Sequence, residues 1–179
     1  MLNTDTLGPF RKPWLLPVLL AQGQLIRVRA RHLPEPPGER RGRVDGQGQA
    51  WRVLAVGDSA AVAVGAPCQE AGLAPSLARE YAARTGRPVE WAVAGRTGLD
   101  AAGCLARLDG LLESAGAAGG GFDLIVTSVG ANDVFGLTGS GKFAAGMGAL
   151  LARLAGLLAA DGRIVVSRAP PFHCSPLFR

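Results

Sequence analysis

Ser59 is the residue of this chain best placed to act as a nucleophile. It follows an apolar run at residues 51–56 and comes directly after Gly57 and Asp58. A serine between a buried strand and a segment of small residues is lifted to the rim of a sheet, where its hydroxyl is accessible. Attack of that hydroxyl on an acyl carbon creates an oxyanion, which donors held in fixed positions must stabilise. The pattern therefore predicts acyl transfer, if such donors lie nearby.

Two later turns supply candidate donors for that oxyanion. Gly95 follows the apolar run 89–93, and because it lacks a Cβ its backbone N–H can approach a bound group closely. Asn132 follows the run 124–129 and adds a side-chain N–H. The backbone amide of Ser59 is a third candidate. We therefore expect Ser59 to be the nucleophile, with Gly95 and Asn132 as donors of an oxyanion hole.

The elements that must position these residues alternate along the chain. Strands are predicted at residues 51–56, 89–93, 124–129 and 163–167, and helices at residues 73–85, 99–113 and 142–159. Strands that alternate with helices of this length predict right-handed crossovers and a doubly wound parallel sheet with helices on both faces. The carboxyl ends of its strands form the edge at which such a sheet binds ligands. Each candidate residue follows one of these ends.

Together the three turns resemble the SGNH (GDSL-type) serine hydrolases, which include esterases and lysophospholipase-like enzymes. The resemblance rests on VLAVGDSAA, VAGRTG and VGANDV, which follow one another in the family's order, and on the Pro-Pro segment APPFH. It covers about residues 51–172. It implies a flavodoxin-like α/β/α sandwich, an acyl-enzyme at Ser59, an oxyanion hole at Gly95 and Asn132, and a small-molecule ester or lipid as substrate. It implies neither a cofactor nor a metal.

The chain departs from this family at its C-terminal end. SGNH hydrolases take their base from a D-x-x-H motif after a fifth strand, and neither the motif nor that strand and its helix occurs before Arg179. The two histidines are His32, in the basic N-terminal part, and His173, a candidate substitute base or an ordinary loop residue. Either the natural product is longer, which we expect, or a short form is real and has become a non-catalytic binding or interaction module.

Residues 1–50 are predicted to be an N-terminal extension and residues 51–179 the hydrolase domain. The formal charge of +5 arises in residues 1–52, which hold nine Lys or Arg and four acidic residues, so nothing indicates a nucleic-acid groove in the domain. Residues 33–50 are rich in Pro, Gly and Arg and predict a turn-rich linker. The apolar residues 14–21 are too few to span a bilayer.

We expect that apolar segment to dock on the domain, or to make peripheral membrane contact within residues 10–31. The expected location is cytoplasmic, with some association with membranes. The sequence predicts no oligomeric state.

Several other motifs have ordinary interpretations. Residues 136–142 (GLTGSGK) imitate a phosphate-binding loop, but Phe143 stands where a Ser or Thr is needed, so a flexible turn is expected. Asp58 is expected to organise the nucleophile turn and not to bind a metal. Asp133 is expected to cap the segment after it or to position Asn132. Three cysteines form no C-x-x-C pair and are predicted to be reduced and mostly buried: Cys68, Cys104 and Cys174.

Overall fold

The computed structural model describes residues 33–167, which belong to one compact unit, Leu33–Pro170. Residues 1–32 and 168–179 lie outside the described part. The expectations for the apolar residues 14–21, for His32 and His173 and for Cys174 therefore fall outside it too. No helix between residues 33 and 167 is both long and apolar enough to cross a bilayer.

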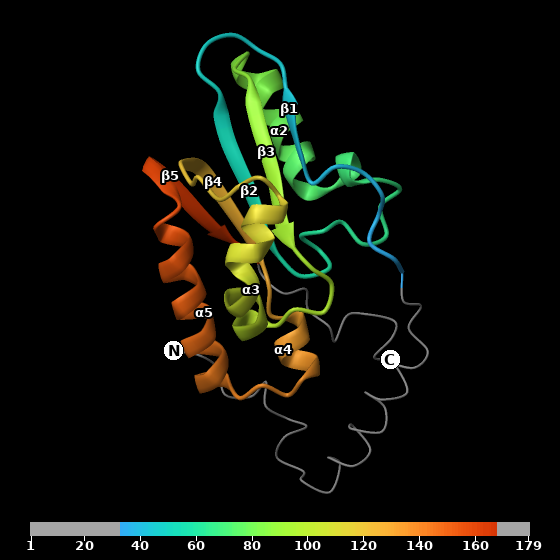
Figure 1. Ribbon diagram of the computed structural model, residues 1–179, viewed down its shortest axis with the longest axis vertical. Coiled ribbons are helices and arrows are strands. Elements are labelled where there is room, and N and C mark those ends of the chain that lie inside the picture. The colour runs from blue at the N-terminus through green and yellow to red at the C-terminus, as the bar shows by residue number, and fades with distance from the viewer. Residues whose placement is uncertain (1–32, 168–179) are drawn as a thin grey trace, which may run out of the picture. The chain divides into compact units, whose positions relative to one another are not determined.

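The described residues form a five-stranded sheet in the order β1-β3-β2-β4-β5 (Figure 1). Strands β2 to β5 are parallel, and β1 runs antiparallel to β3 at one edge. In chain order, the elements are β1 (Arg41–Val44), β2 (Trp51–Gly57), the 3-10 helix η3 (Gln69–Ala71), α2 (Leu73–Thr85), β3 (Val89–Gly95), α3 (Ala101–Ser114), β4 (Phe122–Ser128), α4 (Ala131–Phe135), α5 (Ser140–Ala155) and β5 (Leu158–Val166).

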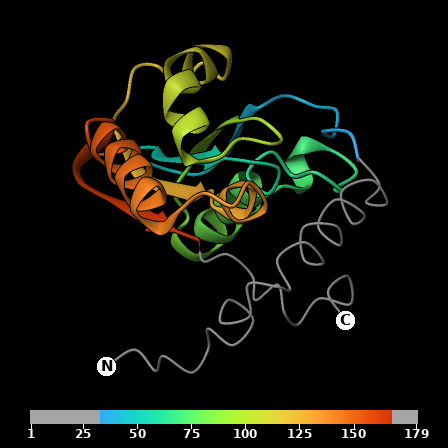
Figure 2. The ribbon, with the colours of Figure 1, turned by 90° about the horizontal axis from the view of Figure 1, so that it is seen from below.

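The predicted α/β class and three-layer arrangement are confirmed. Helix α2 covers one face of the sheet, and α3 and α5 cover the other, as the view along the sheet in Figure 2 shows. The parallel strands lie in the order second, first, third, fourth along the chain, which is the order of the flavodoxin-like folds. In such a sheet, the crevice for ligands lies where the direction of winding reverses, here between β2 and β4.

Strand β2 shows why the central strands read as continuous apolar runs. Successive side chains point to opposite faces of a strand. Leu54 and Val56 pack with the core beneath α3 and α5, whereas Val53 and Ala55 pack with the core beneath α2. All four are buried. A strand with a core on both sides has no polar face, so its apolar run marks its central place in the sheet.

The structure corrects the expectation of a linker at residues 33–50. Residues Arg41–Val44 form β1 and extend the sheet beyond β3. Gly42 lies opposite Trp91, and a Cβ at residue 42 would lie 2.6 Å from the indole ring, so the close approach of the two strands requires glycine. The sequence did not reveal this strand because only Val44 of its four residues is apolar. The division of the chain at residue 50 stays a prediction.

Candidate active site

The three predicted turns leave the sheet at the same level. Gly57, the last residue of β2, pairs with Gly95 at the end of β3 and with Ser128 at the end of β4. Because all three strands are parallel, the segments after these residues emerge at one edge, where Figure 1 also shows α4. The fold therefore brings the turns of Ser59, Gly95 and Asn132 to the same edge of the sheet.

Gly57 makes the close junction of these strands geometrically feasible. Its φ is +148°, a value that residues with a side chain rarely adopt, and a Cβ there would lie 2.0 Å from the carbonyl oxygen of Ser128. The next residue, Asp58, continues the contact because its N–H donates to the same oxygen at 2.9 Å. The nucleophile turn thus starts in direct backbone contact with the end of β4.

Ser59 lies in a tight turn between β2 and η3 and is partly exposed. The Asp58 carboxylate accepts the N–H of Ala60 at 3.1 Å, and the Ser59 carbonyl accepts the N–H of Val64 at 2.9 Å. These bonds fix the backbone on both sides of the serine. Among residues 33–167, no group hydrogen-bonds the Ser59 hydroxyl. The expectation that Asp58 organises this turn agrees with its bond to Ala60.

Two buried carboxylates, Asp58 and Asp133, share this part of the molecule. Burial raises the pKa of Asp58, the amides of Ala60 and of Asp58 itself oppose this rise, and the charge of Asp133 adds to it.

Burial also raises the pKa of the Cys104 thiol to about 11, and the charges of Asp58 and Asp100 contribute. Cys104 on α3 is a free, buried thiol, as predicted, whereas Cys68 is free and partly exposed.

The backbone after Gly95 is held by bonds on two sides. On one side, the Arg96 N–H donates to the carbonyl of Gly57 at 3.1 Å. On the other, the Arg40 guanidinium donates to the carbonyl of Gly95 at 2.6 Å, and the Glu35 carboxylate accepts the N–H of Thr97 at 2.7 Å. Gly95 itself is buried, and a Cβ there would lie 2.7 Å from the Gly57 carbonyl oxygen, so the close contact between the two turns requires glycine.

Glu35 and Arg40 were not predicted as site residues from the sequence. Their side chains form an ion pair and are partly buried. Burial works to raise the pKa of Glu35, but the bonds from Thr97 and the charge and bond of Arg40 outweigh it and hold that pKa below its ordinary value. The two residues lie in the segment that was expected to be a linker. A glutamate and an arginine five residues apart are common in any polar segment, so the sequence carried no signal for this pair.

The turn after β4 is tied to the start of α3. The side-chain amide of Asn132 donates to the carbonyl of Leu99 at 2.9 Å, and the buried Asp133 carboxylate accepts the N–H of Ala101 at 3.0 Å. The expected capping role of Asp133 is therefore right in kind but wrong in target: it caps α3, an earlier helix, because α4 packs beside the start of that helix. An amide NH₂ group has two hydrogens, so Asn132 retains one after the bond to Leu99.

A hollow on the described surface lies beside the turn that follows Gly95, and its lining does not include Ser59, Gly95 or Asn132. It has a volume of about 320 Å³, and its lining includes Arg96, Leu99, Asp100 and Arg107.

The GLTGSGK segment joins α4 to α5, with Thr138 donating its N–H to the carbonyl of Asp133 at 2.9 Å. It thus follows a helix and not a strand, and forms a turn and the first residues of α5.

Two kinds of group do not occur within residues 33–167. There is no histidine in this range, since the two histidines of the chain are His32 and His173. Nor do three His, Cys, Asp or Glu side chains of the described residues gather closely enough to hold a metal ion. The described residues therefore bring together the turns of the candidate nucleophile Ser59 and of the candidate oxyanion donors, and they include no imidazole.

Comparisons with known proteins found one matching family and several similar structures. Residues 55–178 match the model of the GDSL-like lipase/acylhydrolase family. No curated protein matches the chain. Among solved structures, a mutant of the esterase AlinE4 is similar, with 20% identity, a TM-score of 0.56, and coverage of 73% of this chain and 66% of that chain. AlinE4 is described as an SGNH-hydrolase family esterase.

Two further structures share the fold. TesA has 22% identity and a TM-score of 0.52, over 71% of this chain and 66% of that chain. The psychrotrophic esterase EstA from Pseudoalteromonas sp., inhibited by monoethylphosphonate, has 23% identity and a TM-score of 0.50, over 71% of this chain and 64% of that chain. The chain thus spans slightly less than two thirds of the length of each.

Proposed function

Because the chain belongs to the GDSL-like lipase/acylhydrolase family, we propose that it hydrolyses carboxylic esters and that the reaction passes through an acyl-enzyme at Ser59. The substrate class is a small-molecule ester or a lipid. In this proposal Ser59 is the nucleophile, and the backbone N–H of Gly95 and the side-chain N–H of Asn132 are the oxyanion donors. Neither a metal nor a cofactor is needed for these roles.

The proposed reaction has two steps. The Ser59 oxygen attacks the ester carbonyl carbon, its proton passes to a base, and the carbonyl oxygen becomes an oxyanion that accepts hydrogen bonds from Gly95 and Asn132. Collapse of this intermediate breaks the bond to the alcohol, which leaves with the proton. Water then attacks the acyl-enzyme by the same route and releases the acid, which restores the Ser59 hydroxyl.

The base is the part of this mechanism that the described residues do not contain. A serine hydroxyl is a weak nucleophile at neutral pH unless a base takes its proton. His173 is the candidate that this sequence offers, and an added segment with a D-x-x-H motif is the candidate that the family resemblance offers. His173 is the one of these two candidates that variants of this sequence can test.

One observation supports the proposal most strongly, namely the pairing of Gly57 with both Gly95 and Ser128. This double register makes the nucleophile turn and the two donor turns start at one level of the sheet. Glycine is required at residues 57 and 95 because side chains there would meet the neighbouring backbone. Preorganised oxyanion stabilisation requires donors that are held close to the reacting group. The two glycines support the proposal because they let the three turns come close together.

Fluorophosphonate labelling tests the proposal. The reagent phosphonylates an activated serine, and EstA, a structural relative, is inhibited by monoethylphosphonate. If His173 supplies the base, we expect one adduct, located at Ser59 by peptide mass spectrometry, and none in Ser59→Ala. His173→Ala is the matched test of the substitute base. An adduct on another serine, or labelling that survives Ser59→Ala, would contradict the proposal.

A second function is favoured by the absence of a partner for the Ser59 hydroxyl among residues 33–167. A chain with intact turns but no base would be a non-catalytic binding or interaction module. Folded protein that binds an ester analogue at this edge, yet gives no adduct at Ser59, would indicate this alternative.

A further inference from the structure

We propose that Glu35 and Arg40 are positioning residues for the candidate oxyanion donor at Gly95, which they hold in place from a segment outside the βα units. This inference rests on the proposed function, because it assigns these residues a role in the same reaction. Residues 35–40 form a segment that we call the strap.

The strap contacts the Gly95 turn through both of its charged ends. Arg40 donates to the carbonyl of Gly95 at 2.6 Å, and Glu35 accepts the N–H of Thr97 at 2.7 Å. Arg40 and Glu35 also bond each other, so that the pair closes a ring of contacts around the turn. The backbone of the strap is anchored as well, because the carbonyl of Arg40 accepts the N–H of Val93 at 2.7 Å.

The other part of the strap contacts the nucleophile turn through Gln69, which is 1% exposed. Its side-chain amide donates to the carbonyl of Pro36 at 3.2 Å and to that of Val62 at 3.3 Å. Its backbone N–H donates to the carbonyl of Pro37 at 2.9 Å. Val62 belongs to the turn that follows Ser59. The strap therefore bonds the Gly95 turn directly and the Ser59 turn through Gln69, and it limits how far the two turns can move apart.

Such a device is useful because glycine restrains its own backbone less than any other residue. The donor at Gly95 must stay within hydrogen-bond reach of the oxyanion, and a displacement of about 1 Å can cost about 100-fold in rate. The sheet fixes the turn on the side of Gly57, and the strap fixes it on the opposite side. Arg40 suits this role because its guanidinium can donate to Gly95 and to Glu35 at the same time.

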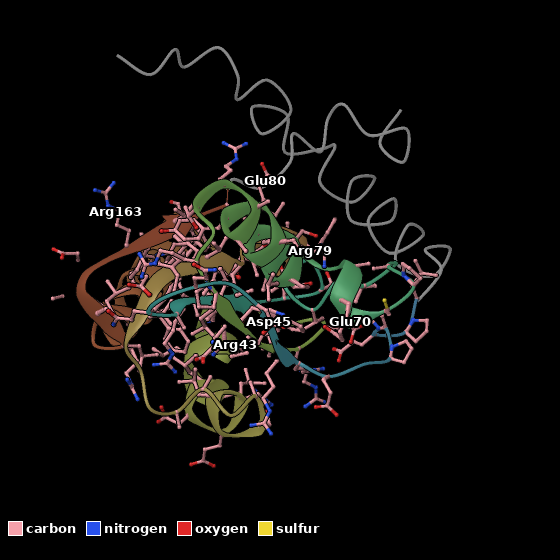
Figure 3. All side chains as sticks on the ribbon, turned by 90° about the horizontal axis from the view of Figure 1, so that it is seen from above. Arg43, Asp45, Glu70, Arg79, Glu80 and Arg163 are labelled. Carbon is pink, nitrogen blue, oxygen red and sulfur yellow. The ribbon has the colours of Figure 1, made fainter. Side chains whose placement is uncertain are left out.

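The first variant to test is Arg40→Met, which keeps an apolar stem but removes every donor. We expect amide hydrogen exchange in the peptide with residues 95–98 to become faster, and the rate of phosphonylation at Ser59 to fall about 10-fold to 100-fold. Arg43→Met is the matched control. Arg43 is on β1, lies near Asp45 (Figure 3) and pairs with Glu90 at 2.9 Å, away from the turns. It should change neither measurement.

A charge swap separates positioning from simple stabilisation. The double variant Glu35→Arg, Arg40→Glu can form an ion pair again, so a purely structural role predicts recovery of the urea midpoint, the exchange rates and the phosphonylation rate. A carboxylate at residue 40 cannot donate to the Gly95 carbonyl, and a guanidinium at residue 35 cannot accept from Thr97. We therefore expect the urea midpoint to recover while the other two rates do not.

The outcomes distinguish this inference from the proposed function. Phosphonylation of Arg40→Met at the wild-type rate, or full recovery in the charge swap, would overturn the positioning role. Unchanged exchange at residues 95–98 in Arg40→Met would overturn the contact on which it rests, even in a chain without any labelling. If the wild type gives no adduct at Ser59, the proposed function fails, and the reaction role of the strap fails with it.

Discussion

The two sides of the candidate site are held in very different ways. The Gly95 turn is bonded by the side chains of Arg40 and Glu35 from a distant part of the chain, and the Asn132 turn bonds the start of α3 through its own Asp133. The Ser59 turn is joined to the end of β4 by the backbone bond from Asp58 to Ser128 and to the segment 35–40 through Gln69, but none of residues 33–167 hydrogen-bonds its hydroxyl. In the proposed reaction, the turns of the oxyanion donors are therefore held by side-chain bonds, whereas the described residues give the attacking hydroxyl no hydrogen-bond partner.

This contrast separates two requirements of acyl transfer. Oxyanion stabilisation depends on donors that do not have to reorganise during the reaction, and the folded body can supply them alone. Activation of a serine depends on a base, which can come from a separate segment. The described residues can thus hold the donors in place and still depend on another part of the protein for the base that sets the rate.

The largest effect is expected at the point where the two sides meet. Gly57→Ala should destabilise the fold by at least about 3 kcal/mol, because the new Cβ would meet the Ser128 carbonyl and would force an unfavourable φ. Gly48→Ala is the control, since Gly48 also has a positive φ but a Cβ there would meet no atom within 4 Å. It should cost about 1 kcal/mol. Equal shifts in urea denaturation would contradict a close junction of β2 and β4.

On the preorganised side, Asn132→Ala should slow phosphonylation of Ser59 by about 100-fold or more, because one oxyanion donor is lost. The control is Asp100→Ala, which removes the bond from the Gly103 N–H to the N-cap of α3 at 2.7 Å. That variant should lose about 1 kcal/mol of stability without slowing the reaction. If both variants react at the wild-type rate, Asn132 is not a donor.

A smaller effect concerns pH and the nucleophile side. Burial raises the pKa of Asp58 above its ordinary 3.8, so the folded state holds this proton more tightly than the unfolded chain. The free energy of unfolding of the wild type should therefore fall relative to Asp58→Asn as pH rises from about 4 toward 7, because the variant keeps an acceptor for Ala60 but cannot ionise. Urea titrations along a pH series measure this. A difference that stays constant with pH would contradict the assignment.

The smallest expected effect is the difference in reactivity between Cys68 and Cys104, and its measurement requires no substitution. Cys104 is buried on the α3 side, where its pKa of about 11 leaves almost no thiolate at neutral pH. In folded protein, iodoacetamide should modify the partly exposed Cys68 and leave Cys104 intact, and in urea it should modify both. Peptide mass spectrometry separates the two sites. Rapid modification of Cys104 in folded protein would show that this side opens readily.

The sequence predicted best the elements whose cause is local. Helix α2 was expected at residues 73–85 and is observed there, because Gly86 in a left-handed conformation ends it. The central strands were recognised because cores on both faces make them continuously apolar. These features depend on neighbouring residues, which a single sequence shows directly.

The features that the sequence did not predict depend on distant partners. Arg40 bonds a residue 55 positions away, and Glu35 one 62 positions away, so neither is marked by local spacing. Asp133 was expected to cap the segment after it, whereas it caps α3, whose Ala101 lies 32 positions earlier. Strand β1 has a single apolar residue, Val44, because it is a short edge strand that packs a glycine against Trp91, and its alternating exposure is therefore hidden in the sequence.

A crystal structure of the phosphonylated protein would show whether Ser59, Gly95 and Asn132 form one acyl-transfer site. The adduct carries an oxygen in the place of the oxyanion. We predict that this oxygen lies about 2.7–3.1 Å from the Gly95 nitrogen and from the Asn132 Nδ2 atom, with phosphorus bonded to the Ser59 oxygen. An adduct oxygen that points away from both nitrogens, or an adduct on another residue, would contradict the claim.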